Sequence, residues 1–169
     1  MSRKISVQFG LISAIAYISV SLIIYATGNN PIGRHSWLIY WMPILFVVLS
    51  VWKLRKLNEG YLNFPDGFVN GFGVGIISAL IISIYLFTLA KIDTSLIDDC
   101  IRQNLKALYV NKNEVISKKG IDLFNRMVKE NSHLTARNIF ADSIIRKLAG
   151  QVITSFFVAA FFRKVKNNG

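Results

Sequence analysis

Long runs without charge alternate with polar segments along this chain. Residues 5–26 form an uncharged run of 22 residues, and residues 67–90 form one of 24. An α-helix rises about 1.5 Å per residue and the hydrocarbon of a bilayer is about 30 Å thick, so both runs are long enough to cross a membrane. The pattern predicts a transmembrane helix in each.

Two shorter apolar runs predict two further crossings. Residues 37–52 carry no charge, and residues 144–162 carry only Arg146 and Lys147 near their start. Long basic side chains at the ends of a short span can extend outward to the headgroups, and we expect this of Lys147. The sequence therefore predicts an all-α fold, a polytopic membrane helical bundle with four transmembrane helices (residues 5–26, 37–52, 67–90 and 144–162) in a single membrane domain, 1–169.

Interfacial anchors are predicted at the ends of the spans. Indole rings favour the boundary between hydrocarbon and headgroups, where basic side chains meet anionic lipid. Pro43, which lacks an N–H donor, is expected to disturb the first turns of the second helix. The predicted anchors are Trp37, Trp41, Trp52, Lys53, Arg163 and Lys164.

The polar segment 91–143 also carries helical patterns. Ser95 followed by Asp98 resembles a capping box, and Thr135 is placed to cap the helix that leads into the last span. Amphipathic helices in this segment could lie on the membrane or pack together. We expect the segment to be helical and extracytoplasmic.

The third apolar run carries small side chains at every fourth position. Steps of four return to almost the same face of a helix, so another backbone can approach closely there. This face could pack within the bundle or against another chain. A phosphate-binding loop at Gly71–Gly75 is rejected, because no strand precedes it and the G-x-G-x-x-G spacing is absent. The predicted helix-packing positions are Gly67, Gly71, Gly75, Ala79 and Ser83.

Charge sets the expected orientation. The net charge is +11, with basic residues clustered beside the apolar runs, which suits contact with lipid headgroups better than with nucleic acid. Basic residues precede the first span, so both termini of a four-span protein are expected in the cytoplasm. The competing interpretation of residues 5–26, a cleaved signal peptide, requires a shorter apolar run.

Few residues suggest chemistry. Cys100 is the only cysteine, and neither histidine has a metal-binding partner at helical spacing, so no cofactor and no metal are expected. The carboxylates Asp93, Asp98 and Asp99 suit helix starts better than an acid–base pair. The polar side chains Gln8, Asn70 and Gln151, within the apolar runs, are expected to bridge helices.

One group of residues carries a resemblance to a known family. Phe64, Asp66, Gly67, Phe68 and Gly71 mark the entry to the third span, and Gly150 and the terminal Arg163-Lys164 belong to the same pattern. On these residues the chain resembles, over nearly its whole length, a bacterial membrane-protein family called domain of unknown function 4199. The resemblance implies a bacterial inner membrane, with the long polar segment in the periplasm. It carries over no catalytic or ligand-binding residue.

The sequence thus predicts an integral inner-membrane protein and no enzyme. A strong packing pattern without catalytic motifs favours a non-enzymatic accessory subunit of a membrane assembly, whose partners are the lipid bilayer and either further copies of itself or another membrane protein. The alternative is a small oligomeric transporter or channel. Its weakness is that the first three spans carry no ionisable group.

Overall fold

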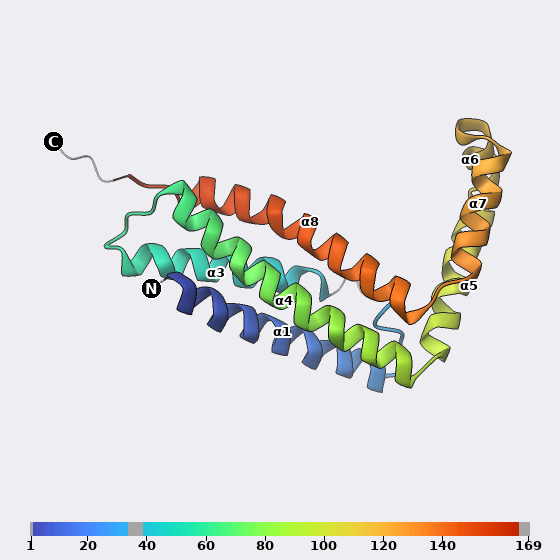
Figure 1. Cartoon of the computed structure of the whole chain (residues 1–169), viewed down its shortest axis with the longest axis horizontal. Helices are drawn as coiled ribbons and strands as arrows, with labels where there is room; N and C mark the ends of the chain where they lie inside the picture. The colour runs from blue at the N-terminus through green and yellow to red at the C-terminus, as the bar shows by residue number, and fades with distance from the viewer. Residues whose placement is uncertain (1, 34–38, 166–169) are drawn as a thin grey trace.

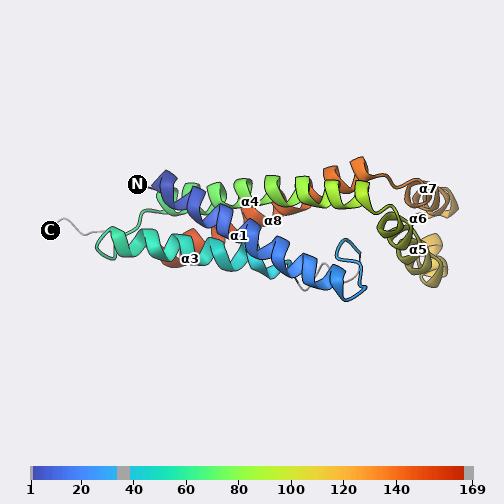
Figure 2. The same cartoon turned by 90° about the horizontal axis from the view of Figure 1, so that it is seen from below.

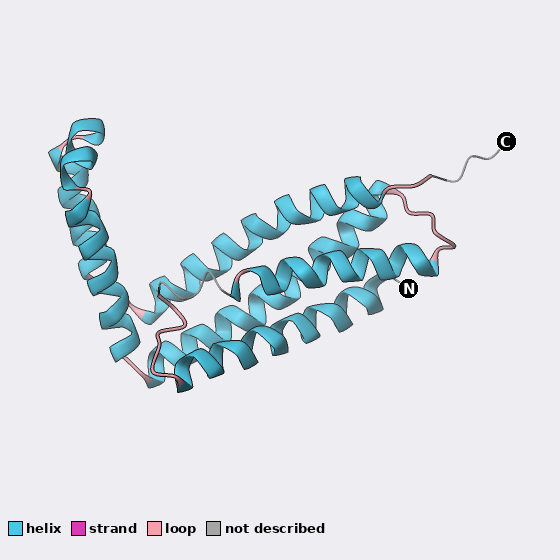
Figure 3. Cartoon of the chain, turned by 180° about the vertical axis from the view of Figure 1, so that it is seen from behind, coloured by secondary structure: helices cyan, strands magenta, loops and turns pink. Residues whose placement is uncertain are grey.

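The computed structural model of the chain describes residues 2–33 and 39–165. These residues form seven helices and no strand, which confirms the predicted all-α class (Figure 3). A single antiparallel bridge joins Leu62 to Lys164. The helices are α1 (Ser2–Ala26), α3 (Trp41–Leu57), α4 (Phe64–Ile92), α5 (Ser95–Val110), α6 (Lys112–Lys119), α7 (Ile121–Ser132) and α8 (Ala136–Phe162).

Four helices form an elongated bundle. Helices α1 and α4 run in one direction, and α3 and α8 run in the opposite one (Figure 1). Helix α4 contacts all three of the others and packs most extensively against α8. Both termini lie at one end of the bundle, and α5, α6 and α7 stand at the other end, across the direction of the bundle helices (Figure 1).

Three helices are long and apolar enough to cross a membrane. These are α1, α4 and α8, with 25, 29 and 27 residues. The predicted crossing at residues 37–52 is not among them. Helix α3 begins at Trp41 and has 17 residues, of which the last turn carries Arg55 and Lys56. It accompanies the other helices along only part of the bundle (Figure 2).

Local sequence explains where the helices begin and end. Helix α1 ends before Gly28, whose φ of 77° is a left-handed conformation that glycine adopts without strain. Pro65 lies in the first turn of α4, where its missing N–H leaves no bond unmade. Pro43 is the third residue of α3 and also lies in its first turn. Helix α8 starts eight residues before the predicted span, so its first turns include residues that the sequence pattern assigned to the polar segment.

The start of α8 confirms the cap predicted at Thr135. Its Oγ1 accepts from the Asn138 N–H at 3.3 Å, and the Asn138 Oδ1 accepts from the Thr135 N–H at 3.0 Å. The capping box predicted at Ser95 and Asp98 was wrong. Thr94 precedes α5 and makes no side-chain cap. Asp93 takes this role, because its Oδ1 accepts from the Ser95 N–H at 3.0 Å.

Replacing Thr135 by alanine should loosen the first turn of α8. Loss of a Ser or Thr cap costs about 1 kcal/mol, which corresponds to roughly a fivefold loss of protection from hydrogen exchange. Amide exchange at residues 137–140, followed by mass spectrometry in detergent, measures this. The control is Thr94→Ala, which removes no cap and should leave exchange at the start of α5 within twofold. Equal effects of the two changes would contradict the assignment.

Helices α5, α6 and α7 form a self-contained arm. Helix α5 packs against α7, with the rings of Tyr109 and Phe124 in edge contact at 5.8 Å between centroids. The Asn104 Nδ2 donates to the Asn131 Oδ1 at 3.0 Å across the same pair of helices. The sequence left open whether these helices lie on the membrane or pack against one another. These contacts show that α5 and α7 pack against one another.

Candidate functional site

The interior of the bundle contains many polar side chains, while its outer surface is apolar. Exposed side chains on α1 and α8 include Ile15, Ile23, Phe157 and Phe161. In a membrane protein, polar groups that face inward either join helices or line a site. The buried polar residues of the bundle helices are Ser6, Ser13, Ser21, Ser50, Asn70, Ser78, Ser83, Ser143, Lys147, Gln151 and Ser155.

Two ladders with four-residue spacing meet between α4 and α8. A methyl group placed on Gly75 would lie 2.6 Å from the Gln151 Cβ, so the two backbones approach as closely as glycine allows. Farther along the same seam, the Ser83 Oγ donates to the Ser143 Oγ at 3.1 Å. The ladder predicted on α4 is therefore buried within the chain. The facing positions are Gly67 with Ala159, Gly71 with Ser155, Gly75 with Gln151, and Ser83 with Ser143.

Lys147 belongs to the ladder of α8. The register places it opposite Ala79, midway between Ser143 and Gln151. Its side chain is only 7% exposed, so the expectation that it extends outward to the headgroups was wrong. The sequence does contain a signal that Lys147 faces inward. Ser143, Lys147 and Gln151 follow each other in steps of four and so share one face of the helix.

The Lys147 ammonium has three partial partners. Its Nζ donates to the Ser143 Oγ at 2.6 Å and lies 5.4 Å and 5.8 Å from the ring centroids of Tyr17 and Tyr40. A hydrogen bond to a charged group contributes about 1.5–3 kcal/mol and a cation–π contact about 0.5–2 kcal/mol. Removing an ammonium from water costs several kcal/mol. These contacts therefore offset much of the cost without neutralising the charge.

No carboxylate pairs with Lys147 among the described residues. The nearby Asp142 is engaged on the outer side of α8, where its Oδ1 accepts from the Arg146 Nε at 2.7 Å. The other two ion pairs, Asp99 with Arg102 and Glu114 with Lys118, lie in the arm. Lys147 is thus a buried cation whose counter-charge is not supplied by residues 2–33 or 39–165.

A small cavity adjoins Lys147. It has room for about 20 Å³ and is lined by Tyr17, Tyr40, Pro43, Ile44, Lys147, Gly150 and Gln151. A single water needs about 10–15 Å³ measured in this way, so the cavity holds one species of about that size. Gln151 is 4% exposed, and its Oε1 has no hydrogen-bond partner in the described part of the chain. The cavity therefore combines a cation with an unsatisfied amide.

A second polar cluster joins three helices near the other end of the bundle. The Asn70 Oδ1 accepts from the Ser6 Oγ at 2.9 Å, and the Asn70 Nδ2 donates to the Ser50 Oγ at 3.1 Å. The bridging role expected of Asn70 is confirmed. Gln8 was wrongly expected to do the same, because it is exposed on the outer face of α1. This cluster ties α4 to α1 and α3.

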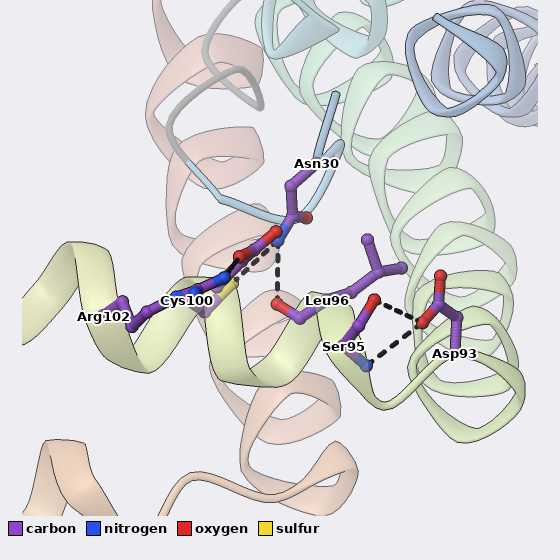
Figure 4. Close-up of polar contacts among 7 residues, drawn as sticks. Asn30, Asp93, Ser95, Leu96, Cys100 and Arg102 are labelled. Carbon is purple, nitrogen blue, oxygen red and sulfur yellow. Dashed lines mark hydrogen bonds and ion pairs between the residues drawn. The ribbon is translucent and has the colours of Figure 1, made fainter. Parts of the chain in front are cut away.

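A third set of polar contacts joins the bundle to the arm (Figure 4). The Asn30 Nδ2 donates to the Leu96 carbonyl at 2.8 Å, and the Cys100 Sγ lies 3.7 Å from the same nitrogen. Burial raises the pKa of the Cys100 thiol, so this cysteine stays protonated. The Asp93 Oδ2 accepts from the Tyr25 hydroxyl at 2.9 Å. These contacts fix the base of α5 against the ends of α1 and α4.

Hydrogen bonds from the Ser95 hydroxyl, the Tyr25 hydroxyl and the Ser95 amide lower the pKa of Asp93. A lowered folded-state pKa means that the carboxylate stabilises this junction fully above its ordinary pKa. That contribution is lost as the pH falls through the lowered value.

Replacing Tyr25 by phenylalanine should raise the pKa of Asp93 toward its ordinary value. Carboxyl ¹³C chemical shifts in micelles measure it, with Tyr109→Phe as a control that should change nothing. An unchanged pKa in the Tyr25 variant would refute the hydrogen bond.

The described residues gather no group of three or more histidine, cysteine or carboxylate side chains that could hold a metal ion. Two of the carboxylates considered above as an acid–base pair bond to different partners. Asp93 pairs with Ser95 and Tyr25, and Asp99 pairs with Arg102. His133 lies just after α7, at the base of the arm.

Most of the predicted anchors lie at the end of the bundle that holds both termini. The Lys56 Nζ lies 4.0 Å from the Trp52 ring centroid, and the Lys164 Nζ lies 5.7 Å from that of Tyr61. Lys53 lies over Phe9, and Arg163 directly follows α8. Trp41 is exposed at the opposite end of α3. Trp37 falls outside the described residues.

Comparison with known proteins adds one match. The sequence model of one protein family, described as "Protein of unknown function (DUF4199)", matches residues 8–164, which include most of α1, the other three bundle helices and the arm. The chain matches none of the curated proteins and none of the solved structures with which it was compared.

Proposed function

We propose, from the premise that the chain belongs to the DUF4199 family, that it is a non-enzymatic accessory subunit of a bacterial inner-membrane assembly. The bundle anchors the protein in the bilayer, and the arm offers a binding surface to a protein partner outside it. The observation that carries this proposal is the arm itself, a separate helical unit at one end of a bundle whose apolar helices suit a membrane.

Four crossings are part of the proposal. Helices α1 and α4 run in the same direction, so the chain between them has to return along the bundle, although α3 by itself is short. Both termini then lie on one side of the membrane. Seven basic residues lie beside the bundle helices at that end, and the nine Lys or Arg of residues 91–143 are spread along the long polar segment among seven Asp or Glu. Long translocated segments are less bound by the positive-inside rule, so by that rule the terminal end is cytoplasmic and the arm periplasmic. The seven basic residues at the terminal end are Arg3, Lys4, Lys53, Arg55, Lys56, Arg163 and Lys164.

The distal tip of the arm is the proposed binding surface. The tip is formed by the end of α5, by α6 and by the start of α7. Val110, the last residue of α5, is 75% exposed, and the neighbouring Tyr109 and the first residue of α7, Ile121, are also exposed. Exposed apolar side chains grouped on a soluble element mark an interaction surface. Neither α1 nor α8 reaches this tip, so packing within the chain leaves it uncovered (Figure 1).

Site-specific photocrosslinking in intact cells tests the role. A photoreactive amino acid at Val110 should give one discrete adduct with a periplasmic or membrane protein. The same amino acid at Lys129, exposed near the base of the arm, is the matched control and should give none. An adduct with lipid alone, or equal patterns from the two positions, would overturn the proposal. An adduct with a second copy of the chain would show a homo-oligomer in place of the accessory subunit.

A second candidate function, a small oligomeric transporter or channel, is favoured by Lys147. Ionisable groups buried at membrane depth often mark solute pathways, and this one faces a cavity inside the bundle. Flux of small ions into proteoliposomes, with Lys147→Met as the comparison, distinguishes it from the accessory role. Flux that needs the lysine would favour transport.

A further inference from the structure

We propose that the cavity beside Lys147 is a binding site for one monatomic anion of halide size. The anion supplies the counter-charge that the described residues do not give to Lys147. This site is independent of the accessory role, because it lies inside the bundle and the arm takes no part in it.

The donors of the site come from α8. The Lys147 ammonium has three N–H groups, and one of them is directed to the Ser143 Oγ at 2.6 Å. Two remain for a ligand in the adjoining cavity. Ser143 itself accepts from Lys147 and from Ser83, which holds the lysine chain toward the interior. A preorganised ammonium of this kind attracts an anion strongly, because the surrounding helices keep water away.

Gln151 gives the second, independent observation. Its side chain is 4% exposed and lines the cavity one helical turn beyond Lys147. Its Oε1 accepts no hydrogen bond within the described ranges. Rotation of the amide exchanges its oxygen for its NH₂ group, which has two donors. In that rotated orientation a bound anion would accept from the buried amide.

The size of the cavity decides the class of anion. Its volume of about 20 Å³ accommodates one sphere slightly larger than a water. Phosphate, carboxylates and lipid headgroups contain several heavy atoms and would extend beyond this volume. The remaining walls, Pro43 and Ile44 from α3 and the rings of Tyr17 and Tyr40, favour a weakly hydrated halide over a strongly hydrated ion.

Asp142 and Arg146, the charged groups that act on Lys147 through space, carry opposite charges. Asp142 and Arg146 pair with each other on the exposed side of α8, with side chains 55% and 71% exposed. On α1 and α4, Tyr17 and Tyr85 are the phenols that face this region. Among the described residues, Lys147 is the one charged side chain that lines the cavity.

The test measures chloride binding directly. Full-length protein in nanodiscs should broaden the ³⁵Cl resonance of sodium chloride, and bromide should remove the broadening whereas gluconate at equal ionic strength should not. Thermal unfolding provides a second measurement, because a ligand that binds only the folded state raises Tm. A rise of roughly 5 °C is expected at about a hundredfold excess over Kd.

Three variants separate the site from general salt effects. Lys147→Met should lower chloride affinity at least tenfold, and Gln151→Leu should lower it severalfold. Arg137→Gln, which changes an exposed cation ten residues earlier on α8, should leave it unchanged. Broadening that persists in Lys147→Met, or stabilisation by gluconate equal to that by chloride, would overturn the proposal and indicate that water fills the cavity. If Lys147→Met does not fold, Lys147→Gln provides the same comparison.

Discussion

Replacing Gly75 by alanine is expected to destabilise the bundle by about 2 kcal/mol. The added methyl carbon would lie 2.6 Å and 2.7 Å from the Cβ and Cγ of Gln151, distances that force α4 and α8 apart. Overpacking of a core costs about 1–3 kcal/mol, and the helix propensity gained by replacing glycine returns at most about 1 kcal/mol. Leucine at the same position should cost more and can prevent folding. Equilibrium unfolding in mixed micelles, followed by tryptophan fluorescence, measures these changes.

Gly150 is the matched control for this prediction. It also lies within a bundle helix, but a methyl group placed on it meets nothing within 4 Å. Gly150 also lines the cavity beside Lys147, so the comparison is made in gluconate buffer without chloride. Gly150→Ala should then leave stability unchanged or raise it by up to about 1 kcal/mol, through helix propensity. The two substitutions are chemically identical and should act in opposite directions. Similar effects at both positions would show that the α4–α8 seam is not as close as the structure describes.

Replacing Asn70 by leucine is expected to destabilise the protein by about 1–3 kcal/mol. The two side chains have the same branching at Cγ, so the change removes the hydrogen bonds while keeping the shape and adding some volume. It removes the bonds to Ser6 and Ser50, which connect α4 to α1 and α3. Hydrogen bonds between membrane helices contribute about 0.6 kcal/mol on average and up to about 1.7 kcal/mol each. Leaving the two serine hydroxyls without this partner adds to the loss.

Thr88→Val provides the comparison on the same helix. The Thr88 hydroxyl is exposed and donates only to the Ile84 carbonyl of its own helix, at 2.9 Å. Removing it should change stability by less than about 0.5 kcal/mol. Exchange-resistant amides in α1 and α3 should lose protection in the Asn70 variant and keep it in the Thr88 variant. An Asn70 variant as stable as the unmodified protein would mean that the polar cluster is dispensable.

Much of the α4–α8 packing pattern was visible in the sequence, but its partner was not. The spacing of Gly67, Gly71 and Gly75 predicted a close helix contact, and a pattern on one helix cannot identify the surface that covers it. The structure places that surface within the same chain, on α8. A role for the protein in assembly therefore has to use another surface, and the exposed tip of the arm is the one proposed above.

Side-chain direction was the main point at which sequence interpretation failed. A lysine near the start of a short apolar run can extend to the headgroups or turn into the bundle, and the two outcomes depend on the rotation of α8 about its axis. That rotation is set by packing against α4, through residues distant in the sequence. The same reason accounts for Gln8, which lies outward, and for Asn70, which lies inward.

The sequence by itself determined the helical class, the apolar helices α1, α4 and α8, the cap at Thr135 and the face of α4 that packs closely. These follow from composition, periodicity and hydrogen bonding within a few residues, which need no distant contact. Only the tertiary structure decided that Lys147 lies beside a cavity without a carboxylate, and that the arm stands across the end of the bundle. Those features depend on which helix faces meet, and free energy summed over contacts between distant residues fixes that choice.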